Sequence, residues 1–488
     1  MSERLLGEVR NLLQQAQAQY SEGPAADEVA SALQRLDGPL QVAFSGKVKA
    51  GKSTLLNALV GEQLAPTDAG ECTKVVSWYE NGLSYGVAIH PKTGAPRPAR
   101  FRRNDGALEV DLEGEDLDAI ERLVVQWPAS SLHELTLIDT PGIASVSTDL
   151  SARALDFLAP GHEQATEADA VIYLMRHLHA SDRRFLESFH DQELSQATPV
   201  NTVAVLSRAD EIGVARLDAM ESARNIAARY RADPQIRRLC QTVVPVGGLI
   251  AEAAATLRED EFRAFTKLAA APRAERDALL VSVDRFSLTE DAFGLLPIER
   301  EHLLLRFGLF GVRLCVDLVD RGTATTAGQL AAELSRESGI DDLRQLLDTV
   351  FRSRRSVLKA RAGLITLRSI LARNPTGAEQ LERELERIMA NAHEISELRL
   401  LNVIRSGQVE FEPELAGQLE RIVGSSGGDA RRRLGLPTEV TDEETRSAAV
   451  ATLGGWRAKL EHPLTTREQS DALQIAVGSV ERLIADLG

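Results

Sequence analysis

The chain has 488 residues, of which 43% are apolar, and its 56 basic and 72 acidic side chains give a formal net charge of −16. This length and hydrophobicity indicate two or three folded domains and exclude an intrinsically disordered polymer. The acidic balance disfavours a general nucleic-acid-binding protein, because contact with phosphates requires clustered positive charge.

Signals for export or membrane insertion are not evident in the sequence. Residues 1–6 lack the basic and then apolar layout of a secretion signal, and the most apolar stretch, 303–319, is interrupted by three charged residues. A spanning helix needs about 20 consecutive apolar residues, so we expect a cytoplasmic protein without one. The cysteines are few and scattered, which predicts reduced thiols and neither a disulfide framework nor a zinc site: Cys72, Cys240 and Cys315.

The apolar pattern divides the chain into helical ends and an α/β middle. Residues 1–37 have helical spacing with a break at Gly23-Pro24, and from residue 39 short apolar runs alternate with helical stretches, which predicts a parallel sheet. We expect its strands at 39–45, 135–138, 171–174, 202–206 and 242–246. From residue 351 the pattern is helical only and predicts a bundle that residues 1–37 could join, with helices near 351–373, 378–405, 411–423, 440–461 and 465–487.

Residues 46–53, Gly-Lys-Val-Lys-Ala-Gly-Lys-Ser, fit the phosphate-loop pattern G-x-x-x-x-G-K-[ST] at every fixed position. The segment follows a predicted strand and precedes a helical run, which is the context that this pattern requires. Glycine at both ends lets backbone N–H groups wrap the phosphates, while Lys52 is expected to bridge the β- and γ-phosphates and Ser53 to ligate Mg²⁺. We expect nucleotide contacts from Gly46, Lys49, Ala50, Gly51, Lys52, Ser53 and Thr54.

The motif Asp139-Thr140-Pro141-Gly142 follows the predicted strand at 135–138. A carboxylate at the end of a strand can hold Mg²⁺ through water, and the N–H of Gly142 can meet the γ-phosphate. Pro-Gly is also common in ordinary turns. The position of the motif, at a strand end downstream of a phosphate loop, favours the nucleotide role.

The motif Ser207-Arg208-Ala209-Asp210 ends the predicted strand at 202–206. The carboxylate of Asp210 can accept hydrogen bonds from N1–H and the 2-amino group of guanine, and the stem of Arg208 can stack on the base. The alternative is that Asp210 caps the helix that follows. After the last predicted strand, Val246 and Gly247 are expected to lie against the edge of the base.

The ordered phosphate loop, Asp-Thr-Pro-Gly and Ser-Arg-Ala-Asp motifs resemble those of translation-factor-related GTPases. The stretches 49–59, 65–67 and 71–76 are similar to those of bacterial dynamin-like proteins. Later stretches narrow the resemblance to the isoniazid-inducible dynamin-like proteins of mycobacteria, and to the shorter of two homologues encoded side by side: 206–213, 243–249, 282–286, 306–313 and 433–436.

The resemblance implies an α/β P-loop GTPase, with a dynamin-type G domain and an all-α helical-bundle neck or stalk. It implies Mg²⁺-dependent GTP hydrolysis coupled to homodimerisation through the G domains and to membrane remodelling, fission or maintenance under envelope stress. The implied location is the inner face of the plasma membrane, and a longer dynamin-like homologue is a candidate partner. A soluble GTP-switch scaffold that recruits proteins without binding lipid is the alternative.

Residue roles also follow from the resemblance. Thr73 would be the catalytic switch I threonine that completes the Mg²⁺ site, with Thr67 as the competing candidate, and Gly142 would be the switch II contact. Two positions depart from the family pattern. Ser207-Arg208 replaces Asn or Thr followed by Lys, which weakens the inference of guanine preference. Lys49 replaces a small polar residue that helps eukaryotic dynamins to hold a monovalent cation.

We hypothesise that Lys49 supplies the missing positive charge at the β–γ bridge and acts as a catalytic residue together with Lys52. The alternative is that Lys49 points to solvent or pairs across a dimer interface. The sequence alone leaves both open.

We expect an N-terminal helical segment at 1–37, a GTPase domain at 38–350 and a helical bundle at 351–488, with net charges of −3, −13 and 0. The neutral bundle could therefore contact an anionic membrane. A mobile basic loop beside the Gly/Ser-rich stretch is the candidate lipid site, with an ordinary solvated loop as the alternative: Arg431, Arg432, Arg433, Leu434 and Leu436. The basic stretch 351–373 could also lie on lipid, but pairing with acidic residues of 378–405 in a helical hairpin is favoured.

Overall fold

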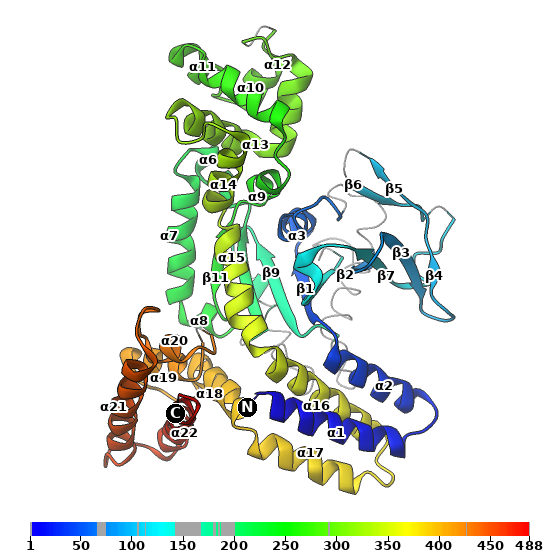
Figure 1. Cartoon of the computed structure of the whole chain (residues 1–488), viewed down its shortest axis with the longest axis vertical. Coiled ribbons are helices and arrows are strands. Elements are labelled where there is room, and N and C mark those ends of the chain that lie inside the picture. Colours follow the sequence, from blue (N-terminus) through cyan, green and yellow to red (C-terminus); the bar gives the residue numbers. More distant parts are fainter. Residues whose placement is uncertain are drawn as a thin grey trace.

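The computed structural model describes residues 2–65, 75–104, 107–112, 114–141, 167–178, 182–183, 186, 201–290, 293–425 and 427–487. Figure 1 shows an α/β part that runs from β1 (Leu40–Gly46) to α15 (Ile340–Leu346). Below it lies a helical part, in which α1 (Ser2–Gln19) and α2 (Pro24–Asp37) join the helices that follow residue 354. Both ends of the chain therefore contribute to the helical part.

Among the described residues, five parallel strands form one half of a nine-stranded sheet. They neighbour one another in the order β11-β10-β9-β1-β8, and each coincides with a strand predicted from the sequence: β11 (Val243–Val246), β10 (Thr202–Ser207), β9 (Ala170–Met175), β1 and β8 (Leu135–Asp139). Because the carboxyl ends of parallel strands meet at one edge of a sheet, the loops that follow them lie together.

The other half of the sheet is mixed, so the prediction of a parallel sheet was wrong for this half. Here β2 (Val76–Asn81) is antiparallel to β8 and parallel to β7 (Ile120–Trp127), while β3 (Gly86–Pro91) is antiparallel to β7 and to the short β4 (Arg97–Pro98). A separate hairpin consists of β5 (Phe101–Asn104) and β6 (Ala107–Val110). None of these six strands was predicted from the sequence, because they are shorter or only half-buried and lack the continuous apolar runs of the five parallel strands.

Helices cover both faces of the parallel half of the sheet. Alternate residues of β10 point to opposite faces, and all of them are buried: Val203 and Val205 on one face, Ala204 and Leu206 on the other. The first face packs against α3 (Lys52–Val60) and α15. The second packs against α7 (Ala219–Ala232), α9 (Gly248–Ala255) and α13 (Pro297–Asp320). A strand buried on both faces must be apolar throughout, which is why these strands were predictable.

A helical insertion separates β11 from α15. It contains α9, α10 (Glu259–Ala269), α11 (Arg273–Leu279), α12 (Val283–Leu288), α13 and α14 (Ala327–Ser338), and α10 to α12 lie at the end of the molecule opposite the helical part (Figure 1). The apolar helix α13 is largely buried and bends at Gly308, whose φ is 64°. Among the described helices, none combines the length and the apolar character needed to cross a membrane.

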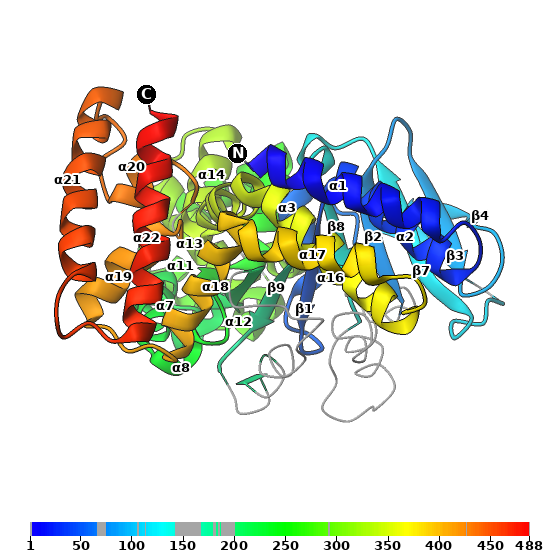
Figure 2. The same ribbon diagram turned by 90° about the horizontal axis from the view of Figure 1, so that it is seen from below.

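The helical part has two separate cores. One joins α1, α2, α16 (Arg355–Arg373) and α17 (Glu379–Asn391). The other joins α18 (His393–Ser406), α19 (Pro413–Ile422), α21 (Asp442–Leu460) and α22 (Arg467–Asp486). The single helix predicted at 378–405 was wrong, because Ala392 has extended backbone (ψ 103°) and divides α17 from α18. Figure 2 shows the result, with α21 and α22 running across the direction of α1 and α17.

The predicted mobile basic loop was wrong in conformation. Residues 430–434 form a short helix, α20 (Ala430–Leu434), whose N-cap Asp429 accepts a hydrogen bond from the Arg432 N–H. Arg431 pairs with Asp442 at 2.6 Å and Arg433 pairs with the half-buried Glu397. Leu434 packs against the second helical core. Of the five candidate lipid residues, Arg431, Arg433 and Leu434 are thus engaged inside the protein.

The expected charge pairing of the basic stretch 351–373 with the next helix was also wrong in its partners. Arg373 pairs with Glu28 of α2, and Arg352 pairs with Glu134. Lys359 is buried and pairs with Asp169 of the α/β part. The basic residues of α16 therefore join the helical part to α2 and to the sheet, because α16 packs more extensively on α1 and α2 than on α17.

Candidate nucleotide site

The carboxyl ends of the parallel strands bring the predicted site residues into one row. In the strand register, Phe44 of β1 lies beside Asp139 of β8, and Gly46 lies beside Leu174 of β9. Farther along the same edge, Ser207 of β10 lies beside Val246 of β11. The phosphate loop, the Asp139 motif and the predicted base-binding segments therefore share one edge of the sheet.

The phosphate loop needs glycine at both of its fixed positions. Gly46 has a φ of 148°, and a Cβ atom there would stand 2.5 Å from the carbonyl oxygen of Leu174. Gly51 has a φ of 89° and is the N-cap of α3. Between them the Ala50 N–H donates to the Lys47 carbonyl at 3.0 Å. The loop thus turns directly into the N-terminus of α3, a position that favours anions.

Lys52, Ser53 and Asp139 meet at the start of α3. The Ser53 Oγ donates a hydrogen bond to Asp139 Oδ2 at 3.1 Å, and Asp139 Oδ1 is buried without a hydrogen-bond partner among the described residues. Burial raises the pKa of Asp139, an effect that Lys52 and the Ser53 hydrogen bond oppose. Burial likewise lowers the pKa of Lys52, opposed by Asp139. Burial thus disfavours the charged forms of both Asp139 and Lys52. A bound cation beside Asp139 and a bound phosphate beside Lys52 would favour those charged forms again.

The two other lysines of the loop differ in their surroundings. Lys47 forms an ion pair with the buried Asp182 at 3.0 Å, and Tyr173 donates to the same carboxylate at 2.9 Å. Lys49 is exposed at the tip of the loop, with a left-handed φ of 62°. Within the described part of the chain, the Lys49 ammonium has no hydrogen bond or ion pair. Lys49 is therefore available to a ligand, whereas Lys47 is held.

The predicted base-binding residues also lie together. Asp210 is buried, and burial raises its pKa to about 6. A Cβ atom on Gly247 would stand 3.4 Å from the Cβ of Asp210, so the two segments are in contact. Arg208 has a left-handed φ of 53° and pairs with Glu211 at 2.6 Å. The alternative of Asp210 as a helix cap is not observed, since Glu211 is the N-cap of the next helix, α6 (Ile212–Ala215).

Comparison with known proteins identifies the family. A family model described as the Dynamin family matches residues 42–209. Isoniazid-induced protein IniC of Mycobacterium tuberculosis (strain CDC 1551 / Oshkosh) is 37% identical over 456 residues, which cover 93% of this chain and 91% of that protein. The chain belongs to the dynamin family and is of the IniC type. The narrower resemblance found in the sequence is thereby confirmed.

More distant dynamin-like proteins match parts of this chain. The bacterial dynamin-like protein of Nostoc punctiforme is 30% identical over 166 residues, or 31% of this chain and 23% of that protein. A solved structure described as an oligomerised bacterial dynamin pair is 13% identical, with a TM-score of 0.35, and covers 99% of this chain and 74% of that chain. The family assignment rests on the sequence relatives.

This dynamin-like chain is a GTPase with GTP as its substrate. The predicted fold class is confirmed, with an α/β dynamin-type GTPase domain and an all-helical neck. Most of the predicted site residues lie along the strand-end edge: Gly46, Lys49, Ala50, Gly51, Lys52, Ser53, Thr54, Asp139, Ser207, Arg208, Asp210, Val246 and Gly247. Thr67, Thr73 and Gly142 lie outside the described residues.

Four polar residues that support this dynamin-like site were not predicted from the sequence. Lys47 and Asp182 were missed because their pairing joins segments far apart in the sequence. Asn57 and Glu252 join α3 to α9 through a hydrogen bond of 3.1 Å. Asn57 did carry a signal, since it is a lone polar residue in the apolar run Leu-Leu-Asn-Ala-Leu of residues 55–59.

Proposed function

We propose that this chain hydrolyses GTP in an Mg²⁺-dependent reaction at the strand-end edge. The observation that carries the proposal is the meeting of Lys52, Ser53 and the buried Asp139 at the N-terminus of α3. Carboxylate and hydroxyl oxygens are the donors that Mg²⁺ prefers, so the residues fit this ion. Ser53 and Asp139 would hold it, and the resemblance adds Thr73.

Each group of the chain has a distinct role in this proposal. When bound, Mg²⁺ neutralises charge that develops on the β- and γ-phosphate oxygens. The backbone of the phosphate loop would orient the phosphates, and Lys52 would contribute a further positive charge to them. Asp210 accepts hydrogen bonds from the guanine edge, while Val246 and Gly247 lie against the base. Lys49, which is free of protein partners in the described structure, supplies a further positive charge at the β–γ bridge.

Paired variants of two lysines test the proposed site. Lys52→Ala should abolish GTP turnover. Lys92→Ala should leave turnover unchanged, because Lys92 is exposed and follows β3, near the end of the sheet away from the phosphate loop. Turnover that survives Lys52→Ala, or that is independent of Mg²⁺ in metal-depleted buffer, would contradict the assignment.

We further propose a division into a GTPase domain at 38–350 and a neck built from 1–37 and 351–488. Ion pairs between the two parts support mechanical coupling, since both Arg35 and Lys359 of the helical part contact Asp169 of the sheet. Through this coupling, nucleotide-dependent pairing of GTPase domains would be converted into membrane remodelling at the inner face of the plasma membrane. Family membership is the support for the dimer and the membrane.

Liposome co-sedimentation separates this reading from a soluble GTP-switch scaffold. Binding to anionic vesicles that increases with a non-hydrolysable GTP analogue supports membrane remodelling, and no binding in any nucleotide state supports the scaffold. Among the five candidate lipid residues of 431–436, all of which the structure describes, Arg432 and Leu436 are not engaged in an ion pair or a core. Arg432→Glu, compared with Arg446→Glu on an exposed face of α21, tests whether this stretch meets lipid.

A further inference from the structure

Asn57 uses every hydrogen-bonding position of its side chain inside the protein. It lies on α3, five residues after Lys52, and is 1% exposed. Its Oδ1 accepts from the N–H groups of Leu64 and Ala65 at 2.9 and 2.7 Å. Its Nδ2 donates to the Ala65 carbonyl at 3.0 Å and to Glu252 Oε1 at 3.1 Å. Asn57 therefore ties α3 to the chain that leads toward Thr67 and Thr73.

Glu252 connects the same point to the base side of the site. It lies on α9, which begins at Gly248 directly after Gly247, and it is 7% exposed. A Cβ atom on Gly248 would stand 3.5 Å from Thr54 Cγ2, so the first turns of α9 and α3 are in contact. The Asn57–Glu252 hydrogen bond is thus a second, deeper connection between these helices.

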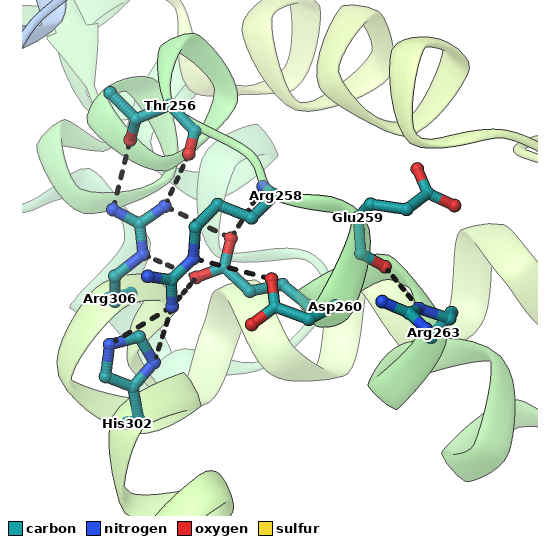
Figure 3. A network of polar contacts seen from close by, with 8 residues as sticks. Thr256, Arg258, Glu259, Asp260, Arg263, His302 and Arg306 are labelled. Carbon is teal, nitrogen blue, oxygen red and sulfur yellow. Dashed lines mark hydrogen bonds and ion pairs between the residues drawn. The ribbon is translucent and has the colours of Figure 1, made fainter.

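The far end of α9 is fixed by other helices of the insertion. Thr256, just after α9, donates through Oγ1 to the Glu252 carbonyl at 2.8 Å. Arg306 of α13 donates to Thr256 Oγ1 and to its carbonyl oxygen at 3.1 and 2.9 Å (Figure 3). Arg306 also pairs with the buried Glu261 of α10 at 2.6 Å. Glu252 therefore contacts Asn57 from a helix whose C-terminal end is held by hydrogen bonds to α13.

We propose that Asn57 and Glu252 are positioning residues for GTP hydrolysis. The pair sets the relation between the phosphate-loop helix, the chain entering the switch I segment and the base-side helix α9. The inference rests on the proposed nucleotide site. Buried polar groups add little net stability compared with well-packed apolar groups, but they favour one geometry because any other leaves them unsatisfied. A displacement of about 1 Å at a reacting centre costs on the order of 10²-fold in rate.

Substitutions of Glu252 separate positioning from packing. Glu252→Gln keeps an oxygen that accepts from Asn57 and should retain kcat within about twofold, since a neutral acceptor serves the same geometry. Glu252→Leu keeps the bulk but removes the acceptor and should lower kcat by about tenfold or more, with little change in the Kd of a fluorescent GTP analogue. A loss confined to nucleotide affinity, or equal kcat in both variants, would overturn the proposal.

A reciprocal exchange gives the second test. Asn57→Asp removes the donor to Glu252 and should lower kcat, because it places two carboxylates face to face. Adding Glu252→Gln restores a donor–acceptor pair in the reverse direction and should recover at least threefold of the loss in kcat. Thermal melting of each variant gives the fraction folded for normalisation. If the double variant is no faster than Asn57→Asp at equal folded fraction, the pair does not act as proposed.

The parent protein and Lys52→Ala serve as references for both tests. If Lys52→Ala retains the parent turnover, the proposed site is wrong whatever the Asn57 variants do. If Lys52→Ala is inactive and Glu252→Gln does not restore the kcat of Asn57→Asp, the nucleotide site is supported and the positioning role of the pair is wrong.

Discussion

Lys359 of α16 lies 2.9 Å from Asp169 at the start of β9, and both side chains are buried. The same carboxylate pairs with Arg35 of α2 at 2.7 Å and accepts from the Gln41 N–H of β1 at 2.9 Å. One buried carboxylate thus joins the amino-terminal ends of β1 and β9 to two helices of the neck.

Removing the charge at this junction should be costly. Asp169→Asn leaves Lys359 and Arg35 without their counter-ion in a buried place, and such a break costs about 3–5 kcal/mol in the free energy of unfolding. Chemical denaturation of Asp169→Asn and of the exposed control Asp284→Asn would measure this. A control that loses as much as Asp169→Asn would show that the junction has no special role.

The same junction predicts an acid dependence of stability. Burial acts to raise the pKa of Asp169, but Arg35 and Lys359 more than offset it and hold the pKa below its usual value. A lowered carboxyl pKa contributes stability that is complete above the unfolded-state pKa of about 4 and is lost as the pH falls through the folded-state value. The difference in unfolding free energy between the parent and Asp169→Asn should therefore be constant from pH 5 to 7 and shrink below about pH 4. A difference that grows on acidification would contradict this sign.

A second polar junction joins the α/β part to the other helical core. Glu420 of α19 pairs with Arg405 of α18 at 3.2 Å and also with Arg237 of α8 (Pro234–Arg237) in the α/β part. Gln241 donates to the Ser425 carbonyl at 2.8 Å beside it. Each core of the neck is thus connected to the α/β part through a carboxylate between two cations. Apolar packing also joins the two parts, since Leu358 of α16 belongs to the core that α3 and α15 form with the sheet.

The sequence predicted what depends on local backbone geometry and continuous burial. The phosphate loop was recognisable because Gly46 and Gly51 must adopt left-handed or sterically crowded conformations between a strand and a helix. The five parallel strands were recognisable because burial on both faces makes most of their residues apolar. The strands of the mixed half, between Val76 and Trp127, were not, since partial exposure admits polar residues such as Glu121 and Gln126 within a strand.

Long-range pairing of charges was not predictable from the sequence. Asp169 contacts Arg35, 134 residues before it in the chain, and Lys359 far after it, and no periodicity links such positions. The same holds for Arg433 and Glu397, whose ion pair attaches the segment predicted as a mobile loop to α18 of the neck. The break at Ala392 was hidden because alanine is a good helix former, and the bend results from packing into two cores.

Guanine recognition by Asp210 should depend on pH within the accessible range. Its pKa in the nucleotide-free protein is raised to about 6 by burial, whereas accepting two N–H groups requires the ionised form. The Kd for GTP should therefore be constant above about pH 7 and rise about tenfold for each pH unit below 6. Titration with a fluorescent GTP analogue from pH 5 to 8 measures this. Asp210→Asn should lose the dependence and bind xanthosine triphosphate better than GTP, because an amide N–H can donate to the 2-oxo group of xanthine.

Lys49 should determine whether hydrolysis requires an added monovalent cation. Its ammonium is exposed and has no partner in the described structure, and its backbone adopts a left-handed φ of 62°. If it supplies the positive charge at the β–γ bridge, the parent enzyme should turn over equally in sodium and potassium buffers. Lys49→Ala should then lower kcat by about 10²-fold, the scale for losing one charge-stabilising group, and Lys49→Arg should retain most of the activity. Unchanged turnover in Lys49→Ala, with or without potassium, would place Lys49 in solvent or at a dimer contact instead.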